Sequence, residues 1–263
     1  MSWSRLFTTA LFLLLPGPII IVVAISFTAA GYIRFPPGEL SLRWYVEFLS
    51  DQRWLDAMLT SVGLALAAAV LTTIVSLMAA LAVARNGGSR FASMFETAVL
   101  APLIFPHAAL GMAMVALAAV FHIYGTFAGL LLAHCIITLP FAYRPISVSL
   151  RKMDGSLEEA AMSLGSQPWN TFTRVTLPLM RPGIVTALLF TFIISFDEVT
   201  ISMFLVGPQV STLPVSIYSY ILESGKPVVA AISTVLVALT LILVLLLERL
   251  VGLELFVEAE KTR

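Results

Sequence analysis

Charged residues are scarce in this sequence, and cysteine is nearly absent. Asp, Glu, Lys and Arg make up 11% of the 263 residues, whereas a soluble domain carries about a quarter. The formal net charge is +0, so the chain lacks the basic surface that binds nucleic acid. The single cysteine, Cys135, excludes a disulfide framework and a multi-cysteine metal site. The composition therefore points away from soluble, secreted and nucleic-acid-binding classes.

Motifs for chemistry are also missing. The sequence has no G-x-x-x-x-G-K-[ST] loop, so the chain cannot hydrolyse ATP by the mechanism that uses this loop. The three histidines, His107, His122 and His134, have no acidic or cysteine neighbour at the spacing of metal ligands. Hydrogen bonds between helices are their expected role. The sequence thus predicts no catalytic residue, no metal and no cofactor in this chain.

Long apolar runs are abundant, and hydrophobic residues reach 59% of the chain. Six segments are long enough to cross about 30 Å of hydrocarbon at about 1.5 Å per residue. We predict an all-α membrane protein, one transmembrane domain over 1–263, with six transmembrane helices: Leu6–Phe27, Leu59–Ala84, Thr97–Phe121, Phe127–Val148, Gly183–Val206 and Val228–Leu247. The first run lacks a clear small-x-small cleavage site, so we interpret it as a retained span rather than a signal peptide.

Lysine and arginine set the predicted orientation. With a cytoplasmic N-terminus, four of these 15 residues fall outside, namely Arg34, Arg43, Arg53 and Lys226, and the other eleven fall inside. The positive-inside rule therefore favours N-in and C-in. The outer loops are then about 28–58 and 207–227, and the one long inner loop is about 149–182. In the first outer loop, Ser41–Leu49 is predicted to be a surface helix with Trp44 and Tyr45 as interfacial anchors.

The inner loop contains the pattern "DGSLEEAAMSLGSQPWNTFTRVTLP", residues 154–178. Ser156 and Glu159 have the spacing of a capping box, which predicts a helix over Leu157–Leu164. Gly165 is placed to end that helix in a left-handed cap. Ser166 and Pro168 then suit the start of a second helix. From local pattern alone, a packed connector between spans is an equally good interpretation.

The spacing of this loop resembles the EAA loop of ATP-binding-cassette (ABC) importer permeases, E-A-A-x3-G-x9-I-x-L-P, with Val175 in place of isoleucine. The resemblance implies the type I importer permease fold and a coupling helix that docks on an ATPase. Glu159 would meet a basic group there, and Gly165 would set the turn. The residues to which the resemblance assigns coupling are Glu159, Ala160, Ala161, Gly165, Leu177 and Pro178.

Three further stretches resemble the polyamine (spermidine/putrescine) branch, second-permease type: "SLRWYVEFLSD", "AHCIITLPF" and "SFDEVTISMFLVGPQVSTLPVSIYSYI". The implied partners are a second homologous permease, two copies of the ATPase, which bind ATP and magnesium, and an external binding protein. The implied location is the bacterial cytoplasmic (inner) membrane, with the lipid bilayer around the chain. A different small solute stays open, as do an ion-coupled secondary transporter and, less favoured, a membrane-embedded protease.

Two adjacent acids, Asp197 and Glu198, interrupt the apolar run "FIISFDEVTISMF". A carboxylate at mid-bilayer costs about 2.5–3.5 kcal/mol on insertion scales, so it is expected to face a cavity or a partner. On one continuous helix, Glu198 shares a polar stripe with Thr191, Ser195 and Ser202 and suits a water-lined solute path. Asp197 points about 100° away and suits an interhelical hydrogen bond or the partner permease. The alternative is that both acids are structural.

Overall fold

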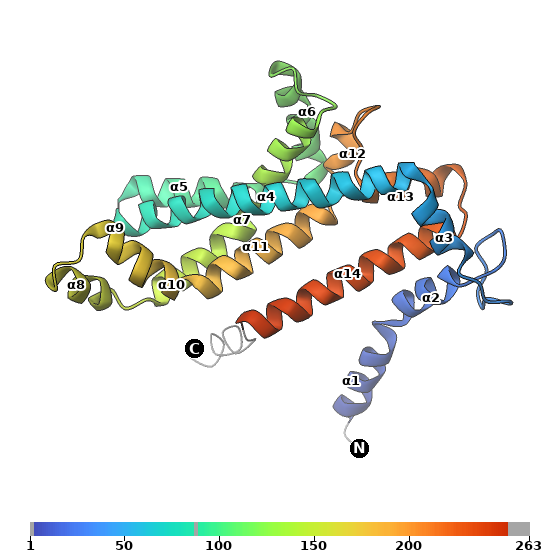
Figure 1. Cartoon of the computed structure of the whole chain (residues 1–263), viewed down its shortest axis with the longest axis horizontal. Coiled ribbons are helices and arrows are strands. Elements are labelled where there is room, and N and C mark those ends of the chain that lie inside the picture. The colour runs from blue at the N-terminus through green and yellow to red at the C-terminus, as the bar shows by residue number, and fades with distance from the viewer. Residues whose placement is uncertain (1–2, 87–88, 252–263) are drawn as a thin grey trace. The chain divides into compact units, whose positions relative to one another are not determined.

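The computed structural model describes residues 3–86 and 89–251. In this described part the regular secondary structure is helical, apart from two isolated bridges that pair Thr28 with Leu40 and Gly207 with Val210 (Figure 1). The elements are α1 (Trp3–Leu14), α2 (Gly17–Ser26), α3 (Arg43–Ser50), α4 (Gln52–Arg85), α5 (Arg90–Leu100), η1 (Ala101–Leu103), α6 (His107–Val120), α7 (Phe127–Lys152), α8 (Ser156–Ser163), α9 (Pro168–Thr171), η2 (Phe172–Thr176, a π-helix), α10 (Leu177–Leu179), α11 (Arg181–Phe196), α12 (Ser202–Leu205), α13 (Leu213–Glu223) and α14 (Val228–Val251).

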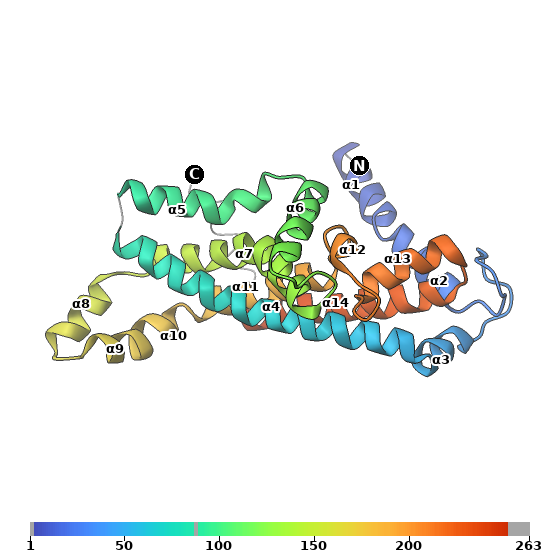
Figure 2. The ribbon, with the colours of Figure 1, turned by 90° about the horizontal axis from the view of Figure 1, so that it is seen from above.

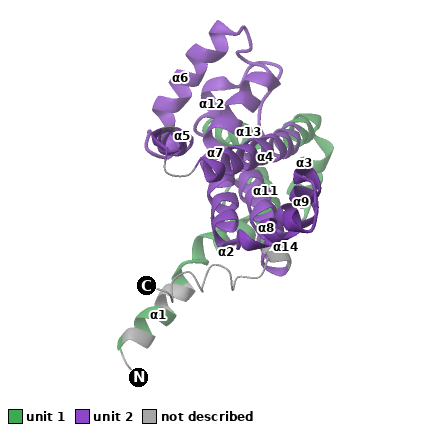
Figure 3. Cartoon of the chain, turned by 90° about the vertical axis from the view of Figure 1, so that its left-hand side faces the viewer, with its two compact units in different colours: residues 1–59, 213–242 green, residues 60–212, 243–263 purple. Residues whose placement is uncertain are grey.

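The chain divides into two compact units (Figure 3). The first comprises residues 1–59 and 213–242, and the second comprises residues 60–212 and 243–263. The EAA loop and both acids of "SFDEV" belong to the second unit. The candidate sites can therefore be described within one unit.

The first unit has a core in which α3 and the start of α4 pack against α13 and the start of α14. Trp44 is 1% exposed, and its Nε1–H donates to the carbonyl of Thr28 at 2.8 Å. The prediction of an interfacial anchor is therefore wrong for Trp44, because residues distant in sequence, such as Leu213 and Val228, join the same core. Tyr45 is partly buried, with its hydroxyl 2.7 Å from Ser26 Oγ.

Three described helices are long and apolar enough to cross a membrane, or up to five if each of two bent helix pairs is one span. The three are Gln52–Arg85, Phe127–Lys152 and Val228–Leu246. The segment predicted as the first span is divided between α1 and α2. Of these, α2 is an apolar helix, but it is too short to cross a membrane alone. The six-span count and the N-in orientation stay predictions.

The second unit is organised by α7 and α11, which pack closely along each other. Gly183 makes this approach possible, since a Cβ there would lie 2.5 Å from Ser149 Cβ and 2.7 Å from the Pro145 carbonyl. Small residues allow helix backbones to come together in this way in membranes. Around the contact lies a core of Ala79, Ala80, Val99, Ala142, Tyr143, Ile146, Met180 and Ala187.

Two predicted spans are not straight helices. In the third, Ala92–Leu103 and His107–Val120 meet at 107°, a bend that is plain between α5 and α6 in Figure 2. Pro106 lies at this bend with an extended ψ of 133°. In the fifth, α11 ends at Phe196 and helix resumes only at Ser202. The prediction of continuous helix to Val206 is therefore wrong, and the break, residues 197–201, contains both acids.

Candidate coupling loop and polar helix break

The first turn of the coupling helix α8 differs from the predicted capping box. Gly155, in a helical conformation, is the N-cap residue and makes no side-chain cap, and Ser156 already lies inside the helix. Asp154 Oδ1 instead accepts the Ser156 N–H at 2.9 Å. Because the backbone and hydroxyl of Ser156 donate to this carboxylate, the pKa of Asp154 is lower than its ordinary value. Asp154, which precedes Gly155, thus caps the start of α8 in place of the predicted capping box of Ser156 and Glu159.

The C-terminal end of α8 is the corner that the sequence predicts. Gly165 has a φ of +86°, a conformation that favours glycine. Its N–H donates to Met162 O at 2.9 Å, and the Ser166 N–H donates to Ala161 O at 3.0 Å, which is the Schellman pattern. Pro168 is the first residue of α9, as predicted. The loop therefore reverses direction at Gly165.

Glu158, which sequence reasoning did not single out, ties the two arms of the loop together. The buried hydroxyl of Thr176 donates to Glu158 Oε1, so α8 is joined to the end of η2. Glu159 and Ala160 are exposed and Ala161 is half-buried. Leu177, half-buried, and Pro178, exposed, lie beyond η2 at the start of α10. The predicted coupling residues thus fall on two helical segments.

Large apolar side chains are exposed on the same loop. Leu164 is 90% exposed, Trp169 is 70% exposed and Met162 is 47% exposed. Apolar residues in a predicted helix are ordinarily assigned to a core, so sequence reasoning missed this surface. Exposed apolar groups gathered on a polar loop mark a surface for contact with another protein.

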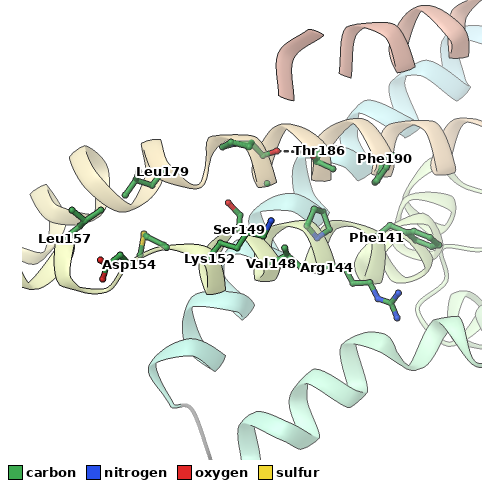
Figure 4. Close-up of a pocket in the computed structure, with 14 residues that line it drawn as sticks. Phe141, Arg144, Val148, Ser149, Lys152, Asp154, Leu157, Leu179, Thr186 and Phe190 are labelled. Carbon is green, nitrogen blue, oxygen red and sulfur yellow. Dashed lines mark hydrogen bonds between the residues drawn. The ribbon is translucent and has the colours of Figure 1, made fainter. Parts of the chain in front are cut away.

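A groove of about 660 Å³ lies where α8 joins the spanning helices (Figure 4). Thr186 and Phe190 of α11 and Ser149 of α7 line it, and Leu157 of α8 lines its end. Its remaining lining residues are Phe141, Arg144, Pro145, Val148, Lys152, Met153, Asp154, Leu179, Pro182 and Gly183. The groove thus involves residues of α7, α8, α10 and α11.

The polar break lies between α11 and α12. Glu198 is 7% exposed, and its Oε1 accepts the Ile201 N–H at 2.8 Å. Its second oxygen, Oε2, lies 3.7 Å from His107 Nδ1 at the start of α6. Asp197 caps the end of α11, and its side chain is exposed. The two acids therefore have different surroundings, and they lie on a break rather than on two faces of one helix. The assignment of Glu198 to a solute path and of Asp197 to a helix contact or a partner stays a prediction.

A single histidine bridges the two sides of the break. His134 is fully buried on α7, with Nδ1 2.8 Å from Ser195 Oγ and Nε2 2.9 Å from Ser202 Oγ. In a neutral imidazole one nitrogen donates and the other accepts, and a hydroxyl can do either. The helix-to-helix hydrogen bonds expected for His134 are confirmed.

Two residues of the predicted polar stripe, Ser195 and Ser202, therefore meet at His134. Ser195 precedes the break, Ser202 follows it, and both are buried. Thr191 is also buried, and within the described part of the chain its hydroxyl has no hydrogen-bond partner. Of the five predicted solute-path residues, the three hydroxyls and Glu198 are buried and Asp197 is exposed.

Residues 73–253 match the family described as binding-protein-dependent transport system inner membrane component. The chain belongs to this family and is an inner-membrane permease subunit of an ABC importer. The class implied by the EAA spacing is confirmed. A secondary transporter and a membrane protease are not favoured.

Among curated relatives, the putrescine transport system permease protein PotI of Escherichia coli K12 is 34% identical over 235 residues, 86% of this chain and 82% of PotI. The spermidine/putrescine transport system permease protein PotC of Haemophilus influenzae is 33% identical over 232 residues, 87% of this chain and 88% of PotC. The resemblance to the polyamine branch is thus confirmed at the level of sequence similarity.

Solved structures share the fold. A chain of a bacterial ABC transporter involved in the import of the acidic polysaccharide alginate matches with a TM-score of 0.71 at 17% identity, covering 95% of this chain and 98% of that one. A chain of the MetNI methionine ABC transporter matches with a TM-score of 0.61 at 18% identity, covering 76% and 96%. At these identities the likeness establishes the importer permease fold and nothing about the solute.

Proposed function

We propose that this chain is one of two different permeases in an importer for polyamines or a related small amino-containing solute. It works with a second homologous permease, two copies of an ATPase that bind ATP and magnesium, and an external binding protein. The names of PotI and PotC support a polyamine. A relative named for 2-aminoethylphosphonate transport, PhnV of Salmonella typhimurium, is 29% identical and supports the wider class of amino-containing solutes.

The observation that carries the solute class is the pair of acids at the helix break. Glu198 is withdrawn from water, and a carboxylate in such surroundings attracts an amine more strongly than it would in water. One or two acids also suit a path that must release its solute, because a dense cluster would retain it. Glu198 is therefore assigned to contact the solute, and Asp197 to contact the partner permease.

The test uses the assembled transporter in proteoliposomes, with radiolabelled putrescine, spermidine and 2-aminoethylphosphonate as probes. Glu198→Gln keeps the shape and removes the charge, so uptake of the cation falls while assembly and basal ATP hydrolysis are retained. Asp197→Asn lowers the amount of partner permease that co-purifies. Glu39→Gln, at an exposed acid of the first outer loop, is the control and transports normally. Normal cation uptake by Glu198→Gln would refute the solute site.

The exposed face of α8 and its corner is assigned to the ATPase. Leu164 and Trp169 provide apolar area, and the exposed Glu159 provides a charge, a combination that suits a protein interface. Closure of the ATPase moves α8, and the Glu158–Thr176 contact passes this movement to η2 and on towards α11. In this way nucleotide binding alters the spanning helices.

Replacing Leu164 with serine removes exposed apolar area without disturbing a core. We expect less ATPase to co-purify and less solute-stimulated ATP hydrolysis, with unchanged membrane insertion. The matched control is Leu222→Ser on α13, where the leucine is 71% exposed. Equal loss of ATPase in both variants would show that the effect is not specific to the coupling loop.

A further inference from the structure

We propose that His107 is the resident counter-ion of Glu198 and that an amino group of the incoming solute displaces it. This inference rests on the proposed transport of a cation. It states which group pairs with the Glu198 carboxylate when no solute is present, and it makes His107 a residue that determines specificity.

The buried carboxylate of Glu198 is stabilised by a positive group beside it. The side chain is 7% exposed, and a carboxylate taken out of water is costly unless a charge or hydrogen bonds compensate. One oxygen is held by the Ile201 N–H at 2.8 Å, which is a neutral donor. The other oxygen faces His107 Nδ1 at 3.7 Å. This second oxygen is where a positive charge is required.

His107 is the group of the packed elements that can carry a positive charge beside Glu198. It is the one titratable residue of α6, and α12 has none. On α7, both nitrogens of His134 are engaged by serine hydroxyls, and the nearest basic residue, Arg144, lies about 15 Å further along the helix. On the break itself, Asp197 adds a charge of the same sign as Glu198. Arg181 is at the opposite end of α11.

The contact is of a kind that can be exchanged. At 3.7 Å it is longer than a hydrogen bond, and the His107 side chain is 55% exposed while that of Glu198 is 7% exposed. The exposed imidazole can therefore move aside, and the amino group of the solute then takes its place beside Glu198 Oε2. Lysine or arginine in this place would remain charged and hold the carboxylate, whereas an imidazole can lose its charge and release it.

A consequence is competition between the solute and the proton on His107. When His107 is charged, the pair with Glu198 is neutral and the solute must displace the imidazolium. When His107 is neutral, the charge of Glu198 is free to attract the cation. The half-saturating concentration of a diamine should therefore rise as the pH on the site's side is lowered.

The first measurement needs no solute. In the purified permease pair, thermal unfolding is followed for Glu198→Gln, His107→Gln and the double variant at pH 6 and pH 8. A resident counter-ion makes the effects of the two single substitutions non-additive at pH 6 and less so at pH 8. Additive effects at both pH values would overturn the proposal, whatever the transporter carries.

The second measurement is putrescine uptake by the assembled transporter in proteoliposomes. His107→Lys, with a fixed charge, should raise the half-saturating concentration by on the order of tenfold at every pH, the factor typical of coupled side chains. His107→Gln should abolish the rise at acid pH. His122→Gln is the control, since His122 is exposed beyond the other end of α6 and should behave as wild type.

The outcomes separate the two proposals. If the wild-type transporter carries no cation, the proposed function fails and displacement by an amino group fails with it, while the solute-free cycle still decides whether His107 pairs with Glu198. If it carries putrescine through Glu198 but His107→Lys transports with a normal half-saturating concentration, only the counter-ion is refuted. Retention of the wild-type pH dependence by His107→Gln would refute it equally.

Discussion

The hydrogen bonds of His134 should be measurable as coupling energies, because each joins a different side of the helix break. Nδ1 is 2.8 Å from Ser195 Oγ on α11, and Nε2 is 2.9 Å from Ser202 Oγ on α12. Hydrogen bonds between helices in membrane proteins contribute about 0.6 kcal/mol on average and up to about 1.7 kcal/mol. His134→Ala also leaves a cavity and two hydroxyls without their partner, so we expect it to lower the free energy of unfolding by about 1–3 kcal/mol.

Two double-mutant cycles separate these contributions. One combines His134→Ala with Ser195→Ala, and the other combines it with Ser202→Ala. The free energy of unfolding is measured by titrating the permease in mixed micelles with a denaturing detergent. Each cycle should give a coupling of about 0.6 kcal/mol, with the maximum near 1.7 kcal/mol. Asparagine at position 134, which has one donor and one acceptor side, should restore part of the stability.

The control is a buried hydroxyl that bonds within its own helix. Thr186 is 2% exposed and donates to Pro182 O at 2.8 Å, a bond internal to α11. Thr186→Ala should show no coupling to His134→Ala. If both serine cycles also give zero within error, the bridging role of His134 is refuted. If only the Ser202 cycle gives zero, the histidine holds α11 alone and the break is not clamped.

Two further predictions concern the loop and the topology. Gly165→Val places a β-branched residue at a φ of +86°, which costs about 1–2 kcal/mol of strain. The variant should insert in the membrane but show lower uptake and lower solute-stimulated ATP hydrolysis. Full solute-stimulated hydrolysis would contradict this. In intact cells, a cysteine at Ser166 should be shielded from an impermeant thiol reagent and one at Gln209 should be labelled, and the reverse pattern would exclude the N-in orientation.

The parts of the fold that the sequence predicts are those decided by local chemistry. The corner at Gly165 is recognisable because a left-handed residue favours glycine, and α9 begins at Pro168 because proline suits the first turn of a helix. The apolar runs likewise give the helical class and the long helices α4, α7 and α14. In each case the information lies within a few residues of the feature.

The parts that the sequence does not predict depend on residues far apart in the chain. The run from Phe192 to Phe204 contains neither glycine nor proline, and nothing local marks a break. Helix ends there because Glu198 accepts the Ile201 N–H and because His134, from another helix, bridges the two sides. The ion contact of Glu198 likewise comes from His107, so a search for ligands at short spacing could not find it. Trp44 is buried for the same kind of reason.

The neighbouring acids of the EAA loop, Glu158 and Glu159, should have separable roles. The Glu158 carboxylate accepts a hydrogen bond from the hydroxyl of Thr176, a residue that is 2% exposed. Glu159, by contrast, is exposed. Glu158→Ala leaves a buried donor without a partner, at a cost of about 1–3 kcal/mol, so limited proteolysis should cut the loop faster. Glu158→Gln keeps an acceptor and should restore resistance.

Glu159→Ala, by contrast, should leave the rate of proteolysis unchanged and weaken co-purification of the ATPase, because the side chain that it removes faces outward. The two substitutions are equal in size and adjacent, so each serves as the control for the other. If Glu159→Ala loosened the loop as much as Glu158→Ala, the carboxylate of Glu159 would be holding α8 after all. If instead Glu158→Ala alone reduced ATPase binding in a loop that still resists proteolysis, the docking charge would have to be reassigned from Glu159 to Glu158.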